Sequence, residues 1–563
     1  MKKTFLYPII LLVLSFFALA PFFHKGFFSM HDDTQVVRVS EMKDALADGQ
    51  FPVRIVENLG YGFGYPIFNF YAPLPYYAGG LINLIGFDSL LSTKAMFVFG
   101  ILLSAFTMFY LVSSFYGKAA GVASGIVYLY FPYHAVNIYV RGAVGEFFAY
   151  AFLPLVFLGI FKILVGKEKI SFNNTFHWIA LSSIAFFLVA ISHNLTLFML
   201  LLLLAVFFVP ALFISRQKLL FTACLAAIII LGVLLSSFYT LPAFGEMGYT
   251  NVSSQIGGGA NYSEHFVCIQ QLWNSQWGFG GSTKDCVDGM SFKLGKLNIL
   301  LIVLASIACI YLLLSKKRKE TNYSLPILSL VVLVASLFFL SKASLLVWDT
   351  IPFMSYLQYP WRFLNFSGFS IAILSGFLVL ALEKYKKNLG MVVMIGIVTG
   401  SLLMNAKLFQ PSFFVNTDPA VYTGQANIRW TTSKISDEYL PKGFIKPQLQ
   451  QDLPSGVVQS LSGEGVTTIQ KRSSIKLAGS FKNETAVIVL IQKAYYPNWK
   501  ATVNGEDAKL TASSRGMTLP LPSGSGTFSV DFKQTALELL GNYLTILGII
   551  VIVAGIIYRR TRK

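Results

Sequence analysis

The sequence contains two neighbouring carboxylates, Asp32 and Asp33, in a position suited to acid–base chemistry. They follow His31 and come shortly after the first long apolar run of the chain. A carboxylate beside a hydroxyl nucleophile can accept its proton while a new bond forms, which accelerates such reactions by a factor of about 10² to 10⁴. Capping of a helix that begins near residue 34 is the alternative role for Asp33, and it requires neither Asp32 nor His31.

Further polar residues lie at the ends of apolar segments elsewhere in the chain. They are Arg54 in the same loop as the acidic pair, Arg141 and Glu146, His193 and Asn194, and Trp361 and Arg362. A guanidinium binds phosphate through two parallel hydrogen bonds, so Arg141 and Arg362 are candidate phosphate ligands, with His31 or His193 in support. Each of the last three pairs also has a structural alternative. Arg141 and Glu146 could be ordinary interfacial residues, with Glu146 as a favourable charge near a helix N-terminus. His193 and Asn194 could form a tight turn between spans, and Trp361 and Arg362 could be an interfacial anchor.

The composition shows what kind of protein must position these residues. Of 563 residues, 55% are hydrophobic and 12% are charged, and the mean hydropathy is +0.62. An average soluble domain has about 25% charged residues. We therefore expect a polytopic helical membrane protein embedded in a lipid bilayer, and we exclude a cytosolic enzyme, a secreted disulfide scaffold and a nucleic-acid-binding domain. The excess of 44 Lys and Arg over 26 Asp and Glu fits basic cytoplasmic loops.

Apolar runs predict about twelve membrane spans, each near the ~20 residues that a bilayer requires. They cover residues 4–23, 95–114, 119–134, 146–165, 176–192, 195–214, 219–239, 297–315, 324–341, 363–383, 388–405 and 541–558. Basic clusters mark the cytoplasmic ends, at Lys167 and Lys169, Arg216 and Lys218, residues 316–319, residues 384–387 and residues 559–563. The span interiors hold almost no ionisable groups, which argues against an ion-coupled transporter.

The first external loop, residues 24–94, is long enough to carry structure of its own. Residues 34–48 have apolar positions at helical spacing, with Gly49 as a stop signal, and we expect an amphipathic helix along the outer leaflet. Residues 72–88 are short and rich in Pro, Gly and Tyr at their start. If they crossed the membrane, every later basic cluster would face outward, so we interpret them as an interfacial or re-entrant helix on the outer face.

Three domains follow from this pattern. Residues 1–405 form the transmembrane domain, residues 406–538 an external β-rich domain, and residues 539–563 a final span with a basic cytoplasmic tail. The β-rich region contains alternating segments at 486–491, 499–503 and 527–532 and a turn at Asn504 and Gly505, which favours a sandwich. Cys268 and Cys286 lie in the external segment 242–296 and are a candidate disulfide, whereas Cys224 and Cys309 lie in apolar runs and are interpreted as packing residues.

The acidic pair after the first span, followed by two juxtamembrane helices, resembles the glycosyltransferase C superfamily, usually shortened to GT-C. The chain also resembles a bacterial membrane family that is labelled as related to 6-pyruvoyl-tetrahydropterin synthase, through the residues named above together with the motif Gln358 to Arg362. The segment from Tyr495 to Lys500 and the last span resemble YfhO-type membrane proteins. A soluble pterin synthase uses a three-His metal site, and no such spacing occurs among His24, His31, His134, His177, His193 and His265.

The resemblance implies an inverting glycosyltransferase in the plasma (inner) membrane, with its active face extracytoplasmic. Its donor would be a polyprenyl-phosphate-linked sugar and its acceptor a glycan or glycolipid of the cell envelope. Asp32 would be the general base and Asp33 the supporting carboxylate, while Arg141 and Arg362 would stabilise the leaving phosphate. A divalent metal between Asp32, Asp33 and the phosphate stays an open alternative.

Two other functions are compatible with the same frame. A lipid or polysaccharide flippase would need a polar pathway through the spans, which the sequence does not contain. A non-catalytic envelope assembly protein would use the β-rich domain for binding and the loops for structure alone.

The topology makes the first testable prediction. A single cysteine at position 90 should react with a membrane-impermeant reagent in intact cells, and one at position 117 should not, because residues 72–88 do not cross the membrane. The reverse labelling pattern would show that they do, and that the candidate residues are divided between the two faces.

Overall fold

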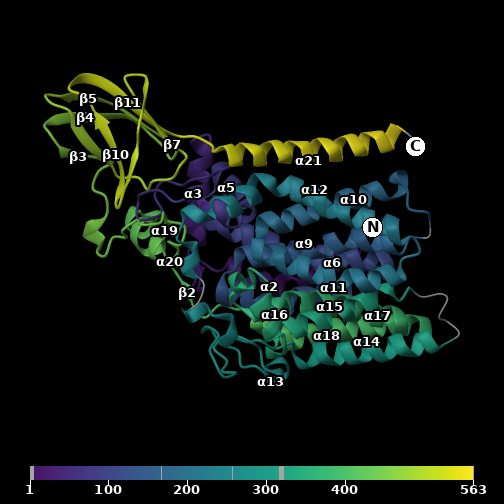
Figure 1. Cartoon of the computed structure of the whole chain (residues 1–563). Helices are drawn as coiled ribbons and strands as arrows, with labels where there is room; N and C mark the ends of the chain where they lie inside the picture. The colour runs from purple at the N-terminus through teal and green to yellow at the C-terminus, as the bar shows by residue number, and fades with distance from the viewer. Residues whose placement is uncertain (1–5, 167, 256–257, 316–321, 562–563) are drawn as a thin grey trace.

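The structure is a computed structural model that describes residues 6–166, 168–255, 258–315 and 322–561. Helices with roughly aligned axes form one body, and a β-sandwich lies at one end of it (Figure 1). The short helices α3, α13, α16, α19 and α20 gather at that same end, while the last helix, α21, runs from the sandwich along the helical body to the C-terminus. Lys167, residues 316–319 and the last two basic residues lie outside the described ranges.

The described residues contain nine helices that are long and apolar enough to cross a membrane. They are α6 (Ser89–Tyr116), α9 (Val144–Leu164), α10 (Phe172–Ser192), α11 (Asn194–Ile214), α12 (Lys218–Gly245), α14 (Lys296–Leu314), α17 (Leu364–Tyr385), α18 (Leu389–Asn405) and α21 (Ala536–Thr561). Two bent pairs, Leu6–Leu14 with Phe16–Phe23 and Ser324–Leu340 with Lys342–Thr350, bring the number to eleven if each is one span. The predicted multi-span helical class is confirmed.

The twelfth predicted span, residues 119–134, differs from the structure. Helix α7 (Lys118–Leu129) has 12 residues and ends before Pro132, because the residue that precedes a proline is disfavoured in the helical region. Phe131 is accordingly extended, with φ −63° and ψ 131°. The chain continues as α8 (Pro132–Ala135) and as a π-helical segment (Val136–Arg141). Single π-helical turns occur frequently at functional sites.

Helix α5 (Pro73–Leu84) corresponds to the predicted interfacial segment 72–88. It has 12 residues, or about 18 Å at 1.5 Å per residue, and is too short to cross a bilayer. A Cβ atom on Gly79 would lie 2.7 Å from the Val39 side chain, so small residues let α5 pack closely on α3 (Gln35–Ala47). Leu90 is buried, whereas Phe87 is 50% exposed, so position 87 is the better reporter for the labelling experiment.

Helix α3 is enclosed by protein, and the expectation that it lies along the outer leaflet is wrong. Every residue from Gln35 to Met42 is buried, and α3 packs against α5, α6 and α19 (Pro419–Thr423). Thr34 is the N-cap residue, its side chain makes no capping hydrogen bond, and Asp33 does not cap the helix either. The predicted stop is confirmed, since Gly49 adopts a φ of +87° just after the helix.

The β-sandwich consists of two antiparallel sheets within residues 458–532. One has the order β3-β6-β10-β9 and the other β4-β5-β11-β7-β8. The strands are β3 (Val458–Ser462), β4 (Gly465–Arg472), β5 (Lys476–Asn483), β6 (Val487–Ile491), β7 (Trp499–Val503), β8 (Glu506–Ala508), β9 (Thr511–Ser513), β10 (Gly516–Leu521) and β11 (Gly524–Phe532). Asn504 and Gly505 turn between β7 and β8 with φ of 52° and 86°, as their sequence predicts.

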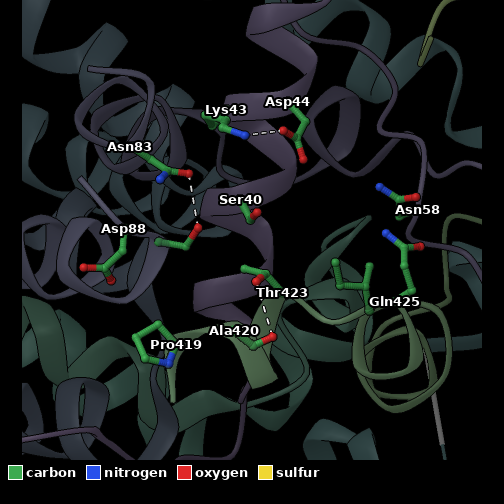
Figure 2. A pocket seen from close by; sticks show the side chains of 12 residues that line it. Ser40, Lys43, Asp44, Asn58, Asn83, Asp88, Pro419, Ala420, Thr423 and Gln425 are labelled. Atoms are coloured by element: carbon green, nitrogen blue, oxygen red, sulfur yellow. Dashed lines mark hydrogen bonds and ion pairs between the residues drawn. The ribbon is translucent and has the colours of Figure 1, made fainter. Parts of the chain in front are cut away.

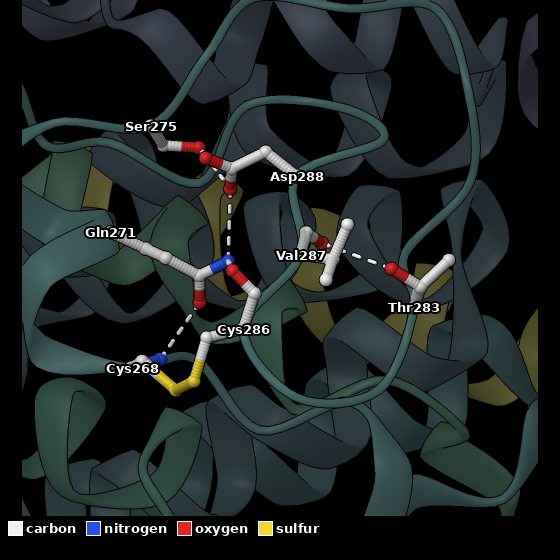
Figure 3. The surroundings of a disulfide bond; sticks show 7 residues. All are labelled: Cys268, Gln271, Ser275, Thr283, Cys286, Val287 and Asp288. Atoms are coloured by element: carbon white, nitrogen blue, oxygen red, sulfur yellow. Dashed lines mark hydrogen bonds between the residues drawn. A yellow bond between two sulfur atoms is a disulfide. The ribbon is translucent and has the colours of Figure 1, made fainter.

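The segment between α18 and the sandwich is not β-rich, in contrast to the prediction for the whole of 406–538. It forms α19, α20 (Ser433–Ile435) and β2 (Phe414–Val415), which pairs with β1 (Phe27–Phe28). This pairing joins the segment to the first loop. Nearby, Cys268 and Cys286 form a disulfide with Cα atoms 5.8 Å apart, in a loop that Gln271 and Asp288 stabilise further by hydrogen bonds (Figure 3).

A buried carboxylate on α3 generates the second prediction. Glu41 accepts hydrogen bonds from the Asn58 backbone N–H (3.0 Å) and side-chain amide (2.9 Å), and burial raises its pKa from 4.5 to about 7. A raised carboxyl pKa in the folded state means that stability falls as the pH rises from about 4.5 to 7, by up to roughly 3 kcal/mol. Relative to wild type, Glu41→Gln should therefore raise the melting temperature more at pH 8 than at pH 5. An equal change at both pH values would contradict a buried, ionised Glu41.

Candidate functional site

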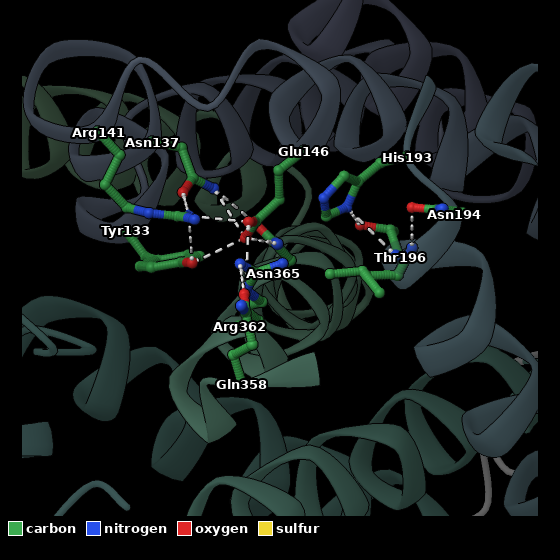
Figure 4. A network of polar contacts seen from close by, with 11 residues as sticks. Tyr133, Asn137, Arg141, Glu146, His193, Asn194, Thr196, Gln358, Arg362 and Asn365 are labelled. Carbon is green, nitrogen blue, oxygen red and sulfur yellow. Dashed lines mark hydrogen bonds and ion pairs between the residues drawn. The ribbon is translucent and has the colours of Figure 1, made fainter. Parts of the chain in front are cut away.

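The carboxylate of Glu146, in the first turn of α9, lies at the centre of a buried polar cluster. Its Oε2 atom accepts a hydrogen bond of 2.8 Å from the Arg141 guanidinium, and its Oε1 atom accepts one of 2.7 Å from the Tyr133 hydroxyl. The Asn365 side chain, from the first turn of α17, donates to Oε1 over 2.8 Å. Glu146 is only 1% exposed, and these partners satisfy its charge. Figure 4 shows Arg141 and Tyr133 on one side of the carboxylate and His193 on the other.

Arg141 is held rigidly by the same neighbours. Its Nη1 atom also donates to Asn137 Oδ1 (2.6 Å) and to the Tyr133 hydroxyl (3.1 Å), and its guanidinium lies 4.6 Å from the ring centre of Trp361. Tyr133, Asn137 and Arg141 are spaced by four residues along α8 and the π-helical segment, which places their side chains on one face.

Arg362 is buried but poorly satisfied. It lies in the turn Pro360–Phe363 before α17 and is 6% exposed. Within the described residues its Nε and Nη1 atoms have no hydrogen-bond acceptor, and the indole Nε1 of Trp361 has none either. Nη2 reaches Gln358 over 3.4 Å, and Nε lies 4.0 Å from Glu146 Oε2. Buried N–H groups without an acceptor are costly, by about 1–3 kcal/mol each. Three such donors side by side indicate a binding site for an anion.

The charge of the cluster supports this conclusion. His193 joins α10 to α11, and its Nδ1 atom accepts the Thr196 backbone N–H over 3.2 Å, which places a ring proton on Nε2. Burial, together with the positive charges of Arg362 and Arg141, lowers the pKa of His193 to about 3, so it is neutral at pH 7. Two arginines then face the carboxylate of Glu146, and the charge of Asp32 also acts on Arg141, so Arg362 is the arginine whose Nε and Nη1 donors have no acceptor within the described residues.

The acidic pair borders this cluster through its backbone. The N–H groups of His31 and Asp32 donate to the carbonyls of Val140 and Arg141, both over 3.0 Å. Asp32 is half-buried, and its charge acts on Arg141. Asp33 instead faces α19, where its charge acts on Tyr422. Although the Asp33 residue is exposed, surrounding protein removes water from its carboxyl and raises its pKa to about 6.

Three residues that the sequence suggested lie apart from the cluster or face away from it. The His31 ring donates from Nε2 to the carbonyl of Phe279 (2.9 Å) in the disulfide-bonded loop. Asn194 accepts the N–H of its neighbour Leu195. Arg54 belongs to a second cluster, described next.

In that second cluster Arg54 is only 3% exposed and bonds to Asn69 (2.7 Å) and to Asn542 (3.3 Å), with Glu538 at 3.8 Å. Asn69 in turn donates to Glu246 at the end of α12. Arg54 therefore joins the first loop to α12 and α21, and does not reach the residues around Glu146.

The sequence reasoning missed Tyr133, Asn137 and Asn365. Their signal was available in retrospect, because Tyr133 and Asn137 precede Arg141 at helical spacing and Asn365 follows Arg362 by three residues. For a metal, the described residues offer no group of three or more His, Cys, Asp or Glu side chains. Asp32 and Asp33 face different elements, so the pair does not form a preorganised metal site.

Part of the chain matches the model of a known protein family. Residues 68–257 match the model of the 6-pyruvoyl-tetrahydropterin synthase related domain, described as a membrane protein. An uncharacterized protein of Lactococcus lactis subsp. cremoris (strain MG1363) is 28% identical over 177 residues. That alignment covers 30% of this chain and 29% of the relative, so the chain matches less than a third of the relative's length.

Solved structures with a similar arrangement are membrane glycosyltransferases. The arabinofuranosyltransferase AftD from Mycobacteria aligns with 76% of this chain and 28% of its own, at 12% identity and a TM-score of 0.46. ArnT from Cupriavidus metallidurans, bound to undecaprenyl phosphate, aligns with 72% of this chain and 89% of its own, at 11% identity and a TM-score of 0.32. The Archaeoglobus fulgidus oligosaccharyltransferase, in complex with Zn and sulfate, aligns with 80% of this chain and 58% of its own, at 10% identity and a TM-score of 0.38. At these values the activity of this chain has to be argued from its own residues.

Arg141 has hydrogen-bond acceptors for its guanidinium, whereas two nitrogen atoms of Arg362 have none among the described residues, and this difference leads to the third prediction. Arg141→Met should lower the melting temperature strongly, because removing one partner of a buried ion pair costs about 3–5 kcal/mol. Arg362→Met should leave it unchanged or raise it, since among the described residues the Nε and Nη1 atoms of this arginine have no acceptor and its Nη2 atom makes a long hydrogen bond of 3.4 Å. Thermal unfolding of the two purified variants against wild type measures this. Equal losses would assign Arg362 a structural role.

Proposed function

We propose that this protein is a membrane glycosyltransferase that transfers a sugar from a polyprenyl-phosphate donor to an extracytoplasmic acceptor of the cell envelope. The observation that carries the proposal is the buried cluster of two arginines around Glu146, next to the carboxylate of Asp32, in which N–H donors of Arg362 and Trp361 have no acceptor among the described residues. The cluster lies where α9 and α17 begin and where α10 meets α11, which is an end of these apolar helices and the level at which the phosphate of a lipid carrier would lie.

The two arginines have different tasks in this scheme. Arg362 binds the donor phosphate through its Nε and Nη1 atoms, together with the indole N–H of Trp361. These three donors have no hydrogen-bond acceptor among the described residues. Arg141 is fixed by Glu146, Tyr133 and Asn137, and it contributes positive charge at a set position. Negative charge grows on the phosphate as it leaves the sugar, and preorganised donors stabilise that charge most in a site that excludes water. His193 is neutral and therefore adds no positive charge to the cluster.

Asp32 supplies the base. Its carboxylate accepts the proton of the acceptor hydroxyl while the hydroxyl oxygen bonds to C1 of the sugar. The bond between C1 and the phosphate oxygen breaks, and its electron pair leaves with the polyprenyl phosphate. A single displacement of this kind inverts the configuration at C1 and requires no enzyme nucleophile. Asp33 supports Asp32 electrostatically and contacts the acceptor side.

One assay separates this proposal from the two other functions. The purified protein in liposomes is incubated with polyprenyl phosphates that carry radiolabelled hexoses or pentoses, together with a cell-envelope fraction. Transfer of label to the envelope fraction supports a glycosyltransferase. Movement of labelled lipid between leaflets without transfer would indicate a flippase, and neither activity would favour an assembly protein.

The fourth prediction concerns the acidic pair. Asp32→Asn should abolish transfer, whereas Asp33→Asn should reduce it mildly, and both should fold normally because neither carboxylate caps α3. Asp285→Asn, in an exposed turn far along the chain, is the matched control and should transfer at the wild-type rate. Near-normal transfer by Asp32→Asn with loss in Asp33→Asn would reverse the two roles. Normal transfer by both variants would remove the chemical basis of the proposal.

A further inference from the structure

A cavity in the described part of the chain lies between α3 and α19, the helix that Asp33 faces. Its volume is about 400 Å³, within the range of about 300–1,000 Å³ that small-molecule pockets occupy. Its walls come from α3, from the start of α6 and from α19 and the residues after it (Figure 2). We propose that this cavity binds the acceptor, and that the acceptor is an uncharged or amino-sugar glycan. The inference rests on the proposed function and adds its substrate class.

The position of the cavity suits an acceptor. Asp33 immediately precedes α3, and Ser40, which lines the cavity, lies seven residues further along, or about 10 Å at the helical rise. Ser40 and Asp44 are one turn apart and share a face of α3. Asp33 also acts on Tyr422, in the same short helix that contributes Thr423 to the cavity. The acidic turn thus contacts the cluster around Glu146 through the backbone of Asp32 and faces the helix that lines this cavity through Asp33.

The lining has the chemistry that recognises sugar hydroxyls. Ser40 is only 7% exposed and lines the cavity (Figure 2). The side chains of Asn58, Thr423 and Gln425 add amide and hydroxyl groups that both donate and accept. Several hydroxyl and amide groups that can both donate and accept match a ligand that carries many hydroxyls.

The charge of the lining adds specificity. A second cavity of about 280 Å³ continues from the first and shares Asp44 and Asn58 with it. Five carboxylates line the two cavities, and two of them are paired: Asp44 with Lys43, and Glu57 with Arg472 and Lys493. The other three, Glu41, Asp48 and Asp88, have no ion-pair partner among the described residues. A phosphate- or carboxylate-bearing polymer would meet like charges here, which disfavours its binding. Uncharged or amino sugars meet no such repulsion.

The test measures glycan binding to the full chain in lipid nanodiscs. Three probes of similar size are titrated: cellotetraose, a glucosamine tetramer and tetragalacturonate. Thr423→Trp fills the cavity from α19, and Val421→Trp is the matched control, because Val421 belongs to the same helix, is 58% exposed and does not line the cavity. Asp44→Asn and Asp88→Asn remove carboxylates, and Asn can also replace Asp88 as the N-cap of α6.

Wild type and Val421→Trp should bind the uncharged or the amino tetramer, and Thr423→Trp should bind it at least about tenfold more weakly. Tetragalacturonate should bind at least about tenfold more weakly than the preferred probe, and the two Asn variants should narrow that difference. If neither neutral nor amino glycan binds, if the two Trp variants behave alike, or if tetragalacturonate binds best, the inference is wrong.

The failure of this inference and the failure of the proposed function give different results. Glycan binding that Thr423→Trp abolishes, in a protein that consumes no polyprenyl-phosphate sugar, would refute the enzyme and retain a glycan site. Sugar transfer that proceeds normally in Thr423→Trp would retain the enzyme and refute this acceptor site. A raised acceptor KM in Thr423→Trp with unchanged donor KM would support both.

Discussion

The buried carboxylate of Glu146 is the constraint on which the candidate site depends. It accepts hydrogen bonds from Arg141 and Tyr133, which precede α9, and from Asn365 of α17, so one charge joins segments more than two hundred residues apart in the sequence. An ionised group at this depth is tolerated only because these partners surround it. The same constraint fixes Arg141, orients the π-helical segment and leaves Arg362 as the arginine with hydrogen-bonding capacity to spare. The N–H donors of Arg362 that find no acceptor in the described part of the chain are the basis of our proposal that the cluster binds an anion.

A second polar cluster, around Arg54 and Glu538, joins the first loop and the β-sandwich to the helices α12 and α21. Arg54 joins the first loop to α12 and α21, and Asn498 in the loop before β7 donates to Glu538 of α21 over 2.9 Å. The sandwich is thereby attached to the helices beside the first loop, and α19 is held against α3. The His31–Asp32–Asp33 turn contacts the cluster around Glu146 through the backbone of Asp32, and Asp33 faces α19, which lines the proposed acceptor cavity. A carboxylate between a bound phosphate and a bound hydroxyl is the arrangement that direct displacement requires.

The sequence predicts the parts of this structure that depend on local pattern. Nine of the twelve predicted spans correspond to long apolar helices of the described residues, or eleven if each bent pair is one span, and the strands around Asn504 and Gly505 follow from alternation and turn residues. The predicted span at 119–134 is a broken helix, because a hydropathy window does not register the break that Pro132 imposes between α7 and α8. For α3, an amphipathic pattern cannot distinguish a lipid surface from a protein surface. Arg54 was grouped with the wrong cluster because its partners Asn69, Glu538 and Asn542 are determined by tertiary contacts, and Asn365 was missed for the same reason.

The central claim is that the cluster around Glu146 binds a lipid-linked phosphate through Arg362, and binding of the lipid alone tests it most directly. The melting temperature of the purified protein is measured with increasing polyprenyl phosphate and, in parallel, with the polyprenol of the same chain length. A ligand that binds the folded state stabilises it in proportion to the logarithm of its concentration above Kd. The account predicts stabilisation by the phosphate and little by the alcohol in wild type, and loss of that difference in Arg362→Met. Equal stabilisation by both lipids, or an undiminished difference in Arg362→Met, would contradict it.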